Sequence, residues 1–258
     1  MLAHLAPAAL FSLEGQVVFM TGGAGGIASG LARGFAAAGA RLVLVDRDER
    51  VEARAAELRA EGAVVAASVL DVTDDKAVQE AVAAVPSRMG RLDIVVNNAA
   101  VIVRKHALDH GVDEFRRVMD INVTACFTVA QAAARLMVER KAGRIINLGS
   151  IMGHVSRPLL VAYVASKGAI HTMTRSLATD LAGTGVTVNA LAPGYTATEF
   201  SEAGNPQFRD FVADWTPSRR WGTPEDLCGP ALLLASQAGS YINGQVIYVD
   251  GGFLAATK

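Results

Sequence analysis

The chain has 258 residues, 51% of them hydrophobic, and a formal net charge of −1 at pH 7. This length and apolar content are enough for a large buried core, so we expect one domain over residues 1–258. Only 6% of the residues are aromatic, and no basic stripe accompanies them. Nucleic acid and anionic membrane surfaces are therefore not expected as partners.

Signals for secretion, membrane insertion and metal binding are also weak. Residues 1–13 are mildly apolar but lack a basic start, so they predict an N-terminal extension and not a secretory signal. No uncharged run reaches the roughly 18 residues that span a bilayer. Cys126 and Cys228 lie far apart without metal-ligand spacing, which favours free thiols over zinc or a disulfide. We expect a cytoplasmic protein without a metal ion.

Short β-branched runs alternate with longer alanine-rich segments along the whole chain. This alternation predicts βαβ units, and hence a doubly wound α/β fold with about seven parallel strands and helices on both faces. Strands are expected at 16–20, 41–45, 63–69, 92–97, 143–148, 186–191 and 245–249. Helices are expected near 26–38, 48–61, 74–88, 113–140, 161–182 and 224–236.

The longest irregular stretch is 193–222, between the sixth strand and the last helix. Pro193 and Gly194 begin it, and Thr223 with Pro224 is typical of a helix start after it. A connection this long is usually functional. We therefore expect 193–222 to form the substrate loop, with short helices of its own.

The first expected strand leads directly into the glycine-rich stretch "MTGGAGGIASG" at 20–30. Residues 23–28 match the G-x-G-x-x-G/A pattern, whose glycines let a pyrophosphate approach the backbone at a helix N-terminus. Asp46 ends the second strand, where a carboxylate can accept hydrogen bonds from the adenosine ribose. That carboxylate would repel a 2′-phosphate, so NAD is favoured over NADP, although Arg47 weakens the preference.

A second constellation follows in the other half of the chain. In "YVASK", Tyr163 and Lys167 stand at i and i+4, and therefore on one face of a helix. Ser150 ends the strand "RIINLGS" at the sheet edge where open α/β folds bind ligands. Asn122 lies early in the long helix at 113–140. Each residue alone has an ordinary structural explanation, but the ordered set behind a glycine turn indicates an active site.

With these motifs the chain resembles the short-chain dehydrogenase/reductase family over essentially its whole length. The resemblance rests on "TGGAGGIA", "DVTD", "NNAA", Asn122, "NLGS", "YVASK", "VNALAPGY" and "YVDGG". Ala28 and Ala100 depart from the glycine usual in the family. The resemblance implies a Rossmann fold, a homotetramer and an NAD(P)-dependent enzyme that acts on CH–OH groups.

The resemblance also implies roles for individual residues. Tyr163 would be the general base or acid, lowered in pKa by Lys167 and the nicotinamide cation, while Ser150 would orient the substrate oxygen. Asn122 would hold a water that relays the proton, and Lys167 would also bind the nicotinamide ribose. The residues expected to bind the cofactor are Gly22, Gly23, Gly25, Gly26, Ile27, Asp46, Arg47, Asp71, Val72, Asn98, Ala99, Tyr163, Lys167, Pro193, Gly194, Thr196 and Thr198.

The substrate is less well determined by the sequence. Segments 137–147, 216–227 and 241–252 are most similar to the gluconate 5-dehydrogenase and polyol dehydrogenase branch, so a sugar acid or polyol is expected. Arg104 either grips a substrate carboxylate or is a solvated arginine. His154 and Arg157 are expected to line the other side of the pocket and to bind hydroxyl or carboxylate groups. For His154, a hydrogen-bonded loop histidine is an equal alternative.

Two other functions stay open at this stage. A 3-oxoacyl-thioester reductase would share the catalytic residues, but Asp46 and the near-neutral charge disfavour NADP and an acyl carrier. A non-catalytic dinucleotide-binding sensor on the same fold would typically lack the Tyr or Lys, and both are present. The apolar helices 113–140 and 161–182 are better explained by an oligomer interface than by a separate structural function.

Overall fold

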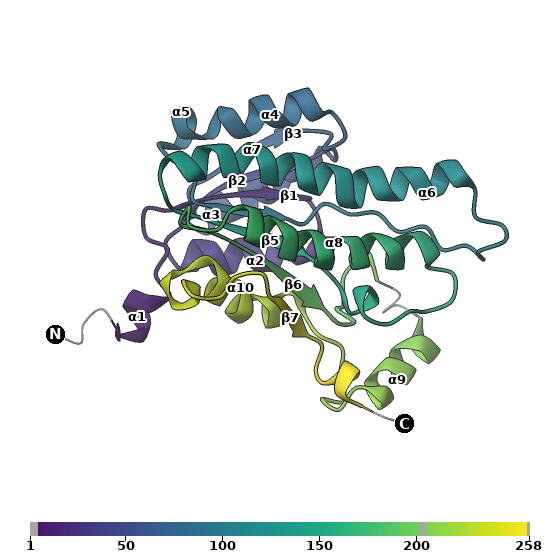
Figure 1. The fold of residues 1–258 in the computed structure, drawn as a ribbon. Coiled ribbons are helices and arrows are strands. Elements are labelled where there is room, and N and C mark those ends of the chain that lie inside the picture. The colour runs from purple at the N-terminus through teal and green to yellow at the C-terminus, as the bar shows by residue number, and fades with distance from the viewer. Residues whose placement is uncertain (1–4, 202–204, 257–258) are drawn as a thin grey trace.

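In the computed structural model, which describes residues 5–201 and 205–256, a parallel sheet forms the centre of the molecule (Figure 1). The strand order is β3-β2-β1-β4-β5-β6-β7, and every neighbouring pair is parallel. The strands are β1 (Val17–Thr21), β2 (Arg41–Asp46), β3 (Val65–Val69), β4 (Ile94–Asn97), β5 (Gly143–Leu148), β6 (Val186–Pro193) and β7 (Val246–Val249). The predicted doubly wound fold and its seven strands are confirmed.

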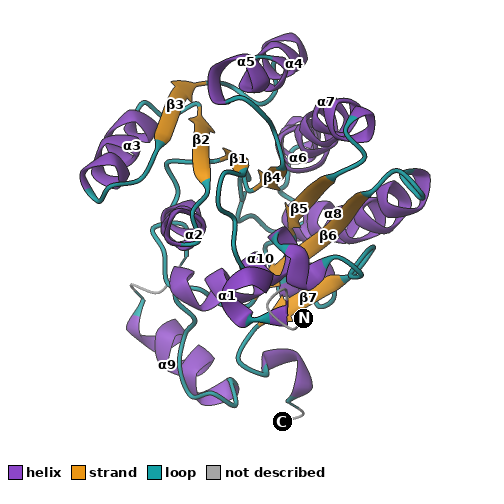
Figure 2. Ribbon diagram, turned by 90° about the vertical axis from the view of Figure 1, so that its left-hand side faces the viewer, coloured by secondary structure: helices purple, strands orange, loops and turns teal. Residues whose placement is uncertain are grey.

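Helices cover both faces of the sheet, as Figure 2 shows end-on. One face carries α2 (Gly26–Ala37), α3 (Arg50–Ala60) and α10 (Cys228–Ala235); the other carries α4 (Asp75–Ala83), α7 (Ala125–Glu139) and α8 (Val161–Asp180). The remaining helices are α1 (Pro7–Leu10), α5 (Val85–Met89), α6 (Val112–Met119) and α9 (Pro206–Trp215). Short turns of other helix types are η2 (Asp120–Thr124), η3 (Ile151–Gly153), η4 (Pro224–Leu227), η5 (Gln237–Gly239) and η6 (Phe253–Ala255).

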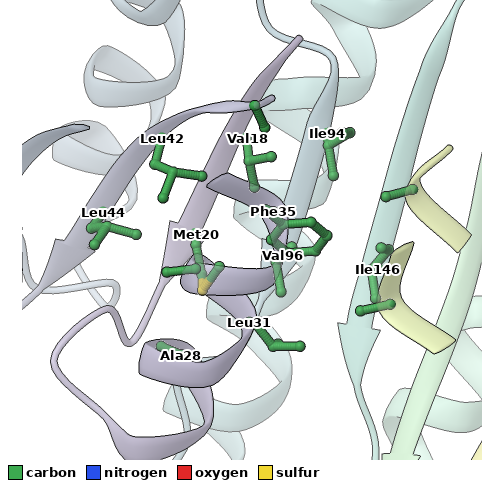
Figure 3. Close-up of a cluster of buried hydrophobic side chains, with 14 of the residues drawn as sticks. Val18, Met20, Ala28, Leu31, Phe35, Leu42, Leu44, Ile94, Val96 and Ile146 are labelled. Atoms are coloured by element: carbon green, nitrogen blue, oxygen red, sulfur yellow. The ribbon is translucent and has the colours of Figure 1, made fainter. Parts of the chain in front are cut away.

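The core between α2 and the sheet is closely packed around small side chains. Leu31 and Phe35 of α2 point toward the strands beside Val18 and Met20 of β1 (Figure 3). Ala28 lies in the same cluster and is completely buried. Its methyl group therefore packs in the core between helix and sheet.

The segment 112–139 forms one continuous rod of α6, the π turn η2 and α7 (Figure 1). By length and composition it could cross a membrane, but 56% of its most apolar window is buried inside the molecule. Val129 and Ala133 of α7 pack in the core beneath β4 and β5. The rod therefore has the burial of a core helix.

The two proposed outlying regions are only partly described. Of the N-terminal extension 1–13, residues 1–4 lie outside the described residues, and α1 precedes β1. Of the substrate loop 193–222, residues 202–204 lie outside the described residues, and α9 forms its middle. The strand order changes direction between β1 and β4, so the carboxyl ends of these two strands open into a crevice where ligands bind in such folds.

Candidate active site

A cleft of about 250 Å³ opens at the carboxyl ends of the central strands. A smaller hollow of about 80 Å³ adjoins it and shares Gly22, Asp46, Ala99 and Ala100 with it. The predicted residues that line the cleft are Gly22, Gly25, Gly26, Ile27, Asp46, Asn98, Ala99, Arg104, Ser150, Arg157, Tyr163, Lys167, Pro193, Gly194, Thr196 and Thr198. Those that line only the hollow are Arg47, Asp71 and Val72.

The glycine turn packs so closely against the segment after β4 that it has no room for a side chain at Gly22. Gly22 has φ +66°, and a methyl group built on it would lie 2.7 Å from Nδ2 of Asn98. That amide nitrogen donates to the carbonyl oxygens of Thr21 and Gly22 at 3.2 and 3.0 Å. Helix α2 then starts after Gly25, whose lack of a side chain leaves the first-turn amides without a side-chain acceptor. This terminus fits the anionic pyrophosphate of a dinucleotide.

Two carboxylates, Asp46 and Asp71, lie beside the glycine turn where the cleft meets the smaller hollow. Asp46 Oδ2 accepts the backbone N–H of Ala24 at 3.1 Å, so the same side chain shapes the glycine turn and faces the cleft. Asp71 accepts the backbone N–H and hydroxyl of Thr73, and these hydrogen bonds lower the pKa of its carboxyl group. Carboxylate oxygens can accept further bonds from ribose hydroxyls. The set of residues therefore fits an adenosine.

Ser150, Tyr163 and Lys167 meet on the other side of the cleft. Ser150 caps η3, and its Oγ accepts the N–H of Met152 at 3.1 Å, so its own hydrogen remains available for donation. Burial raises the pKa of Tyr163, whereas a hydrogen bond with Ser150 and the positive charge of Arg104 lower it. The hydroxyl groups of Ser150 and Tyr163 thus interact directly.

Lys167 is the most deeply buried charged group at the site. Its side chain is 4% exposed, and Nζ donates to the Leu148 carbonyl oxygen at 2.6 Å. Nζ also lies 5.6 Å from the ring centroid of Tyr163. Burial lowers the pKa of Lys167 to about 8. The amine therefore stands at the cleft as a cation that gives up its proton only at a pH of about 8.

Asn122 and Gly23 do not line the cleft. Both amide hydrogens of Asn122 are used, because Nδ2 donates to the Val101 carbonyl and to Ser166 Oγ, each at 3.0 Å. Asn122 thereby ties the segment after β4 to α8, and it does so from within the π turn η2. Gly23 instead packs against Leu44: a methyl group built on Gly23 would lie 2.9 Å from the Cβ of Leu44. Both residues support the site from behind.

The substrate end of the cleft combines two arginines with aromatic rings. Arg104 and Arg157 both line it, and the guanidinium carbon of Arg157 stands 4.0 Å from the ring centroid of Phe208. His154 does not reach the cleft, since its ring packs edge-on against Tyr248 at 5.8 Å. The structure thus brings two of the three predicted substrate residues together.

Several lining residues were not predicted from the sequence. They are Ala100, Ile102, Leu148, Gly149, Ile151, Met152, Leu160, Tyr195, Phe200, Ser201, Phe208 and Trp221. Most are apolar and come from the loop 193–222 or from turns, where no periodic pattern marks a side chain as facing a ligand. Thr21 was also missed: its Oγ1 accepts the N–H groups of Asn98 and Ala99, each at 3.1 Å. The sequence signal that could have identified Thr21 was a hydroxyl side chain at the end of an otherwise apolar strand.

The described residues, 5–201 and 205–256, contain no group of three or more His, Cys, Asp or Glu that could hold a metal ion. A doubly wound sheet, a glycine turn at a free helix N-terminus and a buried Ser–Tyr–Lys group define an oxidoreductase that uses a nicotinamide dinucleotide. The free backbone amides of the glycine turn fit the pyrophosphate of such a cofactor, and the carboxylates of Asp46 and Asp71 fit its adenosine.

Comparison with known proteins agrees with this class. The family model described as enoyl-(acyl carrier protein) reductase matches residues 22–254. A gluconate 5-dehydrogenase of Gluconobacter oxydans is 41% identical over 246 residues, covering 94% of this chain and 96% of the relative. A galactitol 2-dehydrogenase (L-tagatose-forming) of Cereibacter sphaeroides is 43% identical over 249 residues, covering 95% and 97%.

A solved structure of a relative has the same fold as this chain. The gluconate 5-dehydrogenase of Burkholderia cenocepacia, in complex with NADP and tartrate, superposes with a TM-score of 0.92 at 38% identity, covering 97% of this chain and 99% of that one. The chain therefore belongs to the short-chain dehydrogenase/reductase family. It is an NAD(P)-dependent oxidoreductase that interconverts a secondary alcohol and a ketone. The expected preference for NAD is not supported by these comparisons, because the Burkholderia relative holds NADP.

Proposed function

We propose that the enzyme oxidises a secondary alcohol of a sugar acid or polyol and reduces the corresponding ketone in the reverse direction. The observation that carries this proposal is that Arg104 and Arg157 line the same cleft as Ser150 and Tyr163. A guanidinium group can bind a carboxylate through two parallel hydrogen bonds. The names of the Gluconobacter and Burkholderia relatives support a sugar acid, and that of the Cereibacter relative supports a polyol.

In this proposal the cofactor lies along the cleft from Asp46 to Lys167. The first-turn amides after Gly25 hold the pyrophosphate, Asp46 holds the adenosine ribose, and Asp71 and Val72 flank the adenine. Thr198 lies against the start of α2 and so beside the proposed pyrophosphate site, since a methyl group built on Gly26 would lie 3.0 Å from the Cβ of Thr198. Asn98, Ala99, Pro193, Gly194 and Thr196 line the nicotinamide side.

Catalysis in this proposal depends on proton transfer by Tyr163. The nicotinamide dinucleotide supplies the hydride chemistry when it is bound. Tyr163 takes the proton of the alcohol, or donates one to the ketone, and Ser150 orients the reacting oxygen. Lys167 stabilises the phenolate, offsetting the burial that raises the pKa of Tyr163. Because the amide of Asn122 is bonded to Val101 and Ser166, its part in this proposal is to fix the π turn η2 beside the site.

The preference for NAD remains a proposal that rests on the charges at the adenosine end. Asp46 and Asp71 face the cleft or its hollow, and the only cation lining the described part of that end is Arg47. The charge of Arg47 already acts on Asp48 and Asp71. A 2′-phosphate would therefore meet an uncompensated carboxylate, and we expect kcat/KM for NAD to exceed that for NADP by about 10-fold or more.

The substitution Asp46→Asn tests this preference. The amide oxygen of Asn can still accept the N–H of Ala24, so this contact with the glycine turn is kept while the negative charge is removed. The substitution also removes the acceptor of the Asp48 N–H, which Asp46 Oδ1 accepts at 3.0 Å. We expect the ratio of kcat/KM for NAD to that for NADP to fall at least about fivefold. Asp48→Asn is the matched control, because Asp48 is bonded to Arg50 and does not line the cleft. An unchanged ratio in Asp46→Asn would contradict the proposal.

The reaction itself is tested by following the absorbance of the reduced nicotinamide with NAD and NADP across polyols, aldonates, hydroxysteroids and acyl thioesters. Activity confined to NADP and acyl thioesters would favour a 3-oxoacyl-thioester reductase. The variant Tyr163→Phe removes the phenolic proton with little change in shape, and we expect kcat to fall by about 10³-fold. Turnover close to that of the unmodified enzyme would contradict the mechanism.

A homotetramer in the cytoplasm is also proposed. Phe127 and Val138 of α7 and Val112 of α6 leave apolar surface exposed, at 40%, 36% and 65%. Strand β7 is an edge strand that is only half-buried. Surfaces of this kind are often covered by another copy of the chain. Sedimentation equilibrium would give four times the chain mass of 26.9 kDa, and a monomer would contradict the proposal.

A further inference from the structure

A buried histidine packs against the turn that carries Ser150. His171 lies on α8 one turn beyond Lys167, and its side chain is 5% exposed. A methyl group built on Gly149 would lie 2.5 Å from its Nε2, and one built on Gly153 would lie 2.5 Å from its Cε1. Such distances do not occur between real side chains. Glycine is therefore required at both positions, on either side of Ser150, because the imidazole occupies that space.

The imidazole also makes the polar contact that the Ser150 backbone needs. The N–H of Ser150 donates to Nε2 of His171 at 3.5 Å, and the preceding N–H of Gly149 donates to the Leu191 carbonyl at 2.8 Å. Ser150 is itself 92% buried, so an unpaired N–H there would be unfavourable. Nε2 can accept this hydrogen bond only while it carries no proton.

The surroundings of His171 keep the ring neutral. Burial lowers the pKa of His171 to about 4, and the charges of Lys167, Arg175 and His154 act in the same direction. Tyr248 from β7 packs edge-on against the ring at 5.9 Å, and its other side contacts His154, which directly follows η3. Burial and the charges on its own helix and after the Ser150 turn therefore favour an uncharged acceptor, while Tyr248 of β7 fills the space beside the ring.

We propose that His171 is a positioning residue that fixes the Ser150 turn, and through it the Ser150 hydroxyl relative to Tyr163. The proposal rests on the roles assigned to Ser150 and Tyr163 under the proposed function. His171 itself touches neither the cleft nor the reacting atoms. An apolar side chain at 171 would fill the space but leave the Ser150 N–H without an acceptor, and the hydroxyl would lose its fixed direction.

The test compares two substitutions that differ in the acceptor. His171→Leu fills the space without an acceptor, whereas His171→Gln retains an oxygen that can accept the Ser150 N–H. We expect Leu to lower kcat by about 10- to 100-fold, with the Kd for NADH within about twofold of the unmodified enzyme, and Gln to recover most of the loss. The pKa read from the pH profile of kcat/KM should rise in the Leu variant, because the hydrogen bond from Ser150 lowers the pKa of Tyr163.

Thr174→Val is the matched control for stability. Thr174 is completely buried on the same helix, and its Oγ1 accepts Nδ2 of Asn147 at 3.0 Å, away from Ser150. The control should lower Tm as much as His171→Leu while leaving the pH profile unchanged. Equal losses in the Leu and Gln variants, or losses in proportion to Tm across all three, would overturn the proposal.

A measurement that does not need turnover separates this inference from the proposed function. Hydrogen exchange followed by mass spectrometry on the peptide containing 149–153 reports the protection of the Ser150 amide. We expect faster exchange in His171→Leu and restored protection in His171→Gln. An enzyme inactive on every substrate would refute the proposed function while the exchange still tests His171. Unchanged exchange in the Leu variant would refute the positioning role alone.

Discussion

Burial of Lys167 makes this residue costly for the fold, and its removal should stabilise the protein while abolishing activity. The perturbation is Lys167→Met, which keeps the unbranched stem and removes the amine. Burial lowers the pKa of Lys167 from its ordinary value of 10.5 to about 8. This change corresponds to roughly 3 kcal/mol of lost stability at pH 7, at about 1.4 kcal/mol for each tenfold change in proton affinity.

The lost hydrogen bond reduces this gain. Nζ donates to the Leu148 carbonyl at 2.6 Å, and an orphaned buried carbonyl costs about 1–2 kcal/mol. We therefore expect Lys167→Met to be more stable than the unmodified protein at pH 7 by about 1–2 kcal/mol. The same variant should lose kcat by about 10³-fold or more, because the ammonium charge of Lys167 no longer stabilises the Tyr163 phenolate.

The sign of the pH dependence gives the sharper assay. Because the folded-state pKa is depressed, the native protein binds fewer protons than the unfolded chain between pH 8 and 10.5, so this group's contribution to stability rises with pH in that window. The advantage of Lys167→Met should therefore be full at pH 7 and shrink by pH 9.5 in urea unfolding. Lys76→Met, at a side chain 87% exposed, is the control and should show no such trend. Parallel curves for Lys167→Met and the unmodified protein would refute the reasoning.

Three further substitutions test the fold and the Ser150 turn. Ala28→Gly should cost about 1–2 kcal/mol of stability, from helix propensity and a lost core methyl, and change NADH affinity only modestly; a hundredfold gain in affinity would contradict the packing role. Asp93→Asn should cost about 2 kcal/mol in urea unfolding, because the buried carboxylate that pairs with Arg91 and Arg140 is lost, and a cost near zero would contradict this. Gly149→Ala should displace His171 and lower kcat at least about 10-fold, and an unaffected kcat would show that the turn adapts.

The sheet could be predicted from the sequence because its strands are covered on both faces. Such strands are continuous apolar runs, and β5 was predicted over its observed range, 143–148. Errors arose where local chemistry interrupts a periodic segment. The expected helix 74–88 divides at Ala84, two residues before Pro86, which cannot donate a backbone hydrogen bond. The π turn η2 within 113–140 has no signal in the sequence, since it depends on contacts that Asn122 makes with distant segments.

The residues of the candidate site also fall into those that the sequence could predict and those that it could not. The glycine turn, Asp46 and the Tyr163–Lys167 pair could be predicted because each depends on residues close together in sequence or at a strand end. Phe208 and His171 could not, since their significance depends on how 193–222 and α8 pack against the turn after β5. Arg157 illustrates the difference: the sequence places it between Ser150 and Tyr163, but only the fold shows it stacked on Phe208.

The placement of one cation and one neutral ring on the same face of α8 follows from electrostatics. Lys167 and His171 stand four residues apart, and each lies in surroundings that disfavour charge. Two adjacent buried cations would repel each other strongly in a medium of low dielectric constant, so only one can keep its proton. The amine keeps it up to a pH of about 8 and the imidazole gives it up above a pH of about 4. Between these two pH values, the charged amine of Lys167 lies beside Tyr163, where it stabilises the phenolate. The neutral imidazole of His171 accepts the hydrogen bond of the Ser150 N–H. The proposed chemistry requires both states at once.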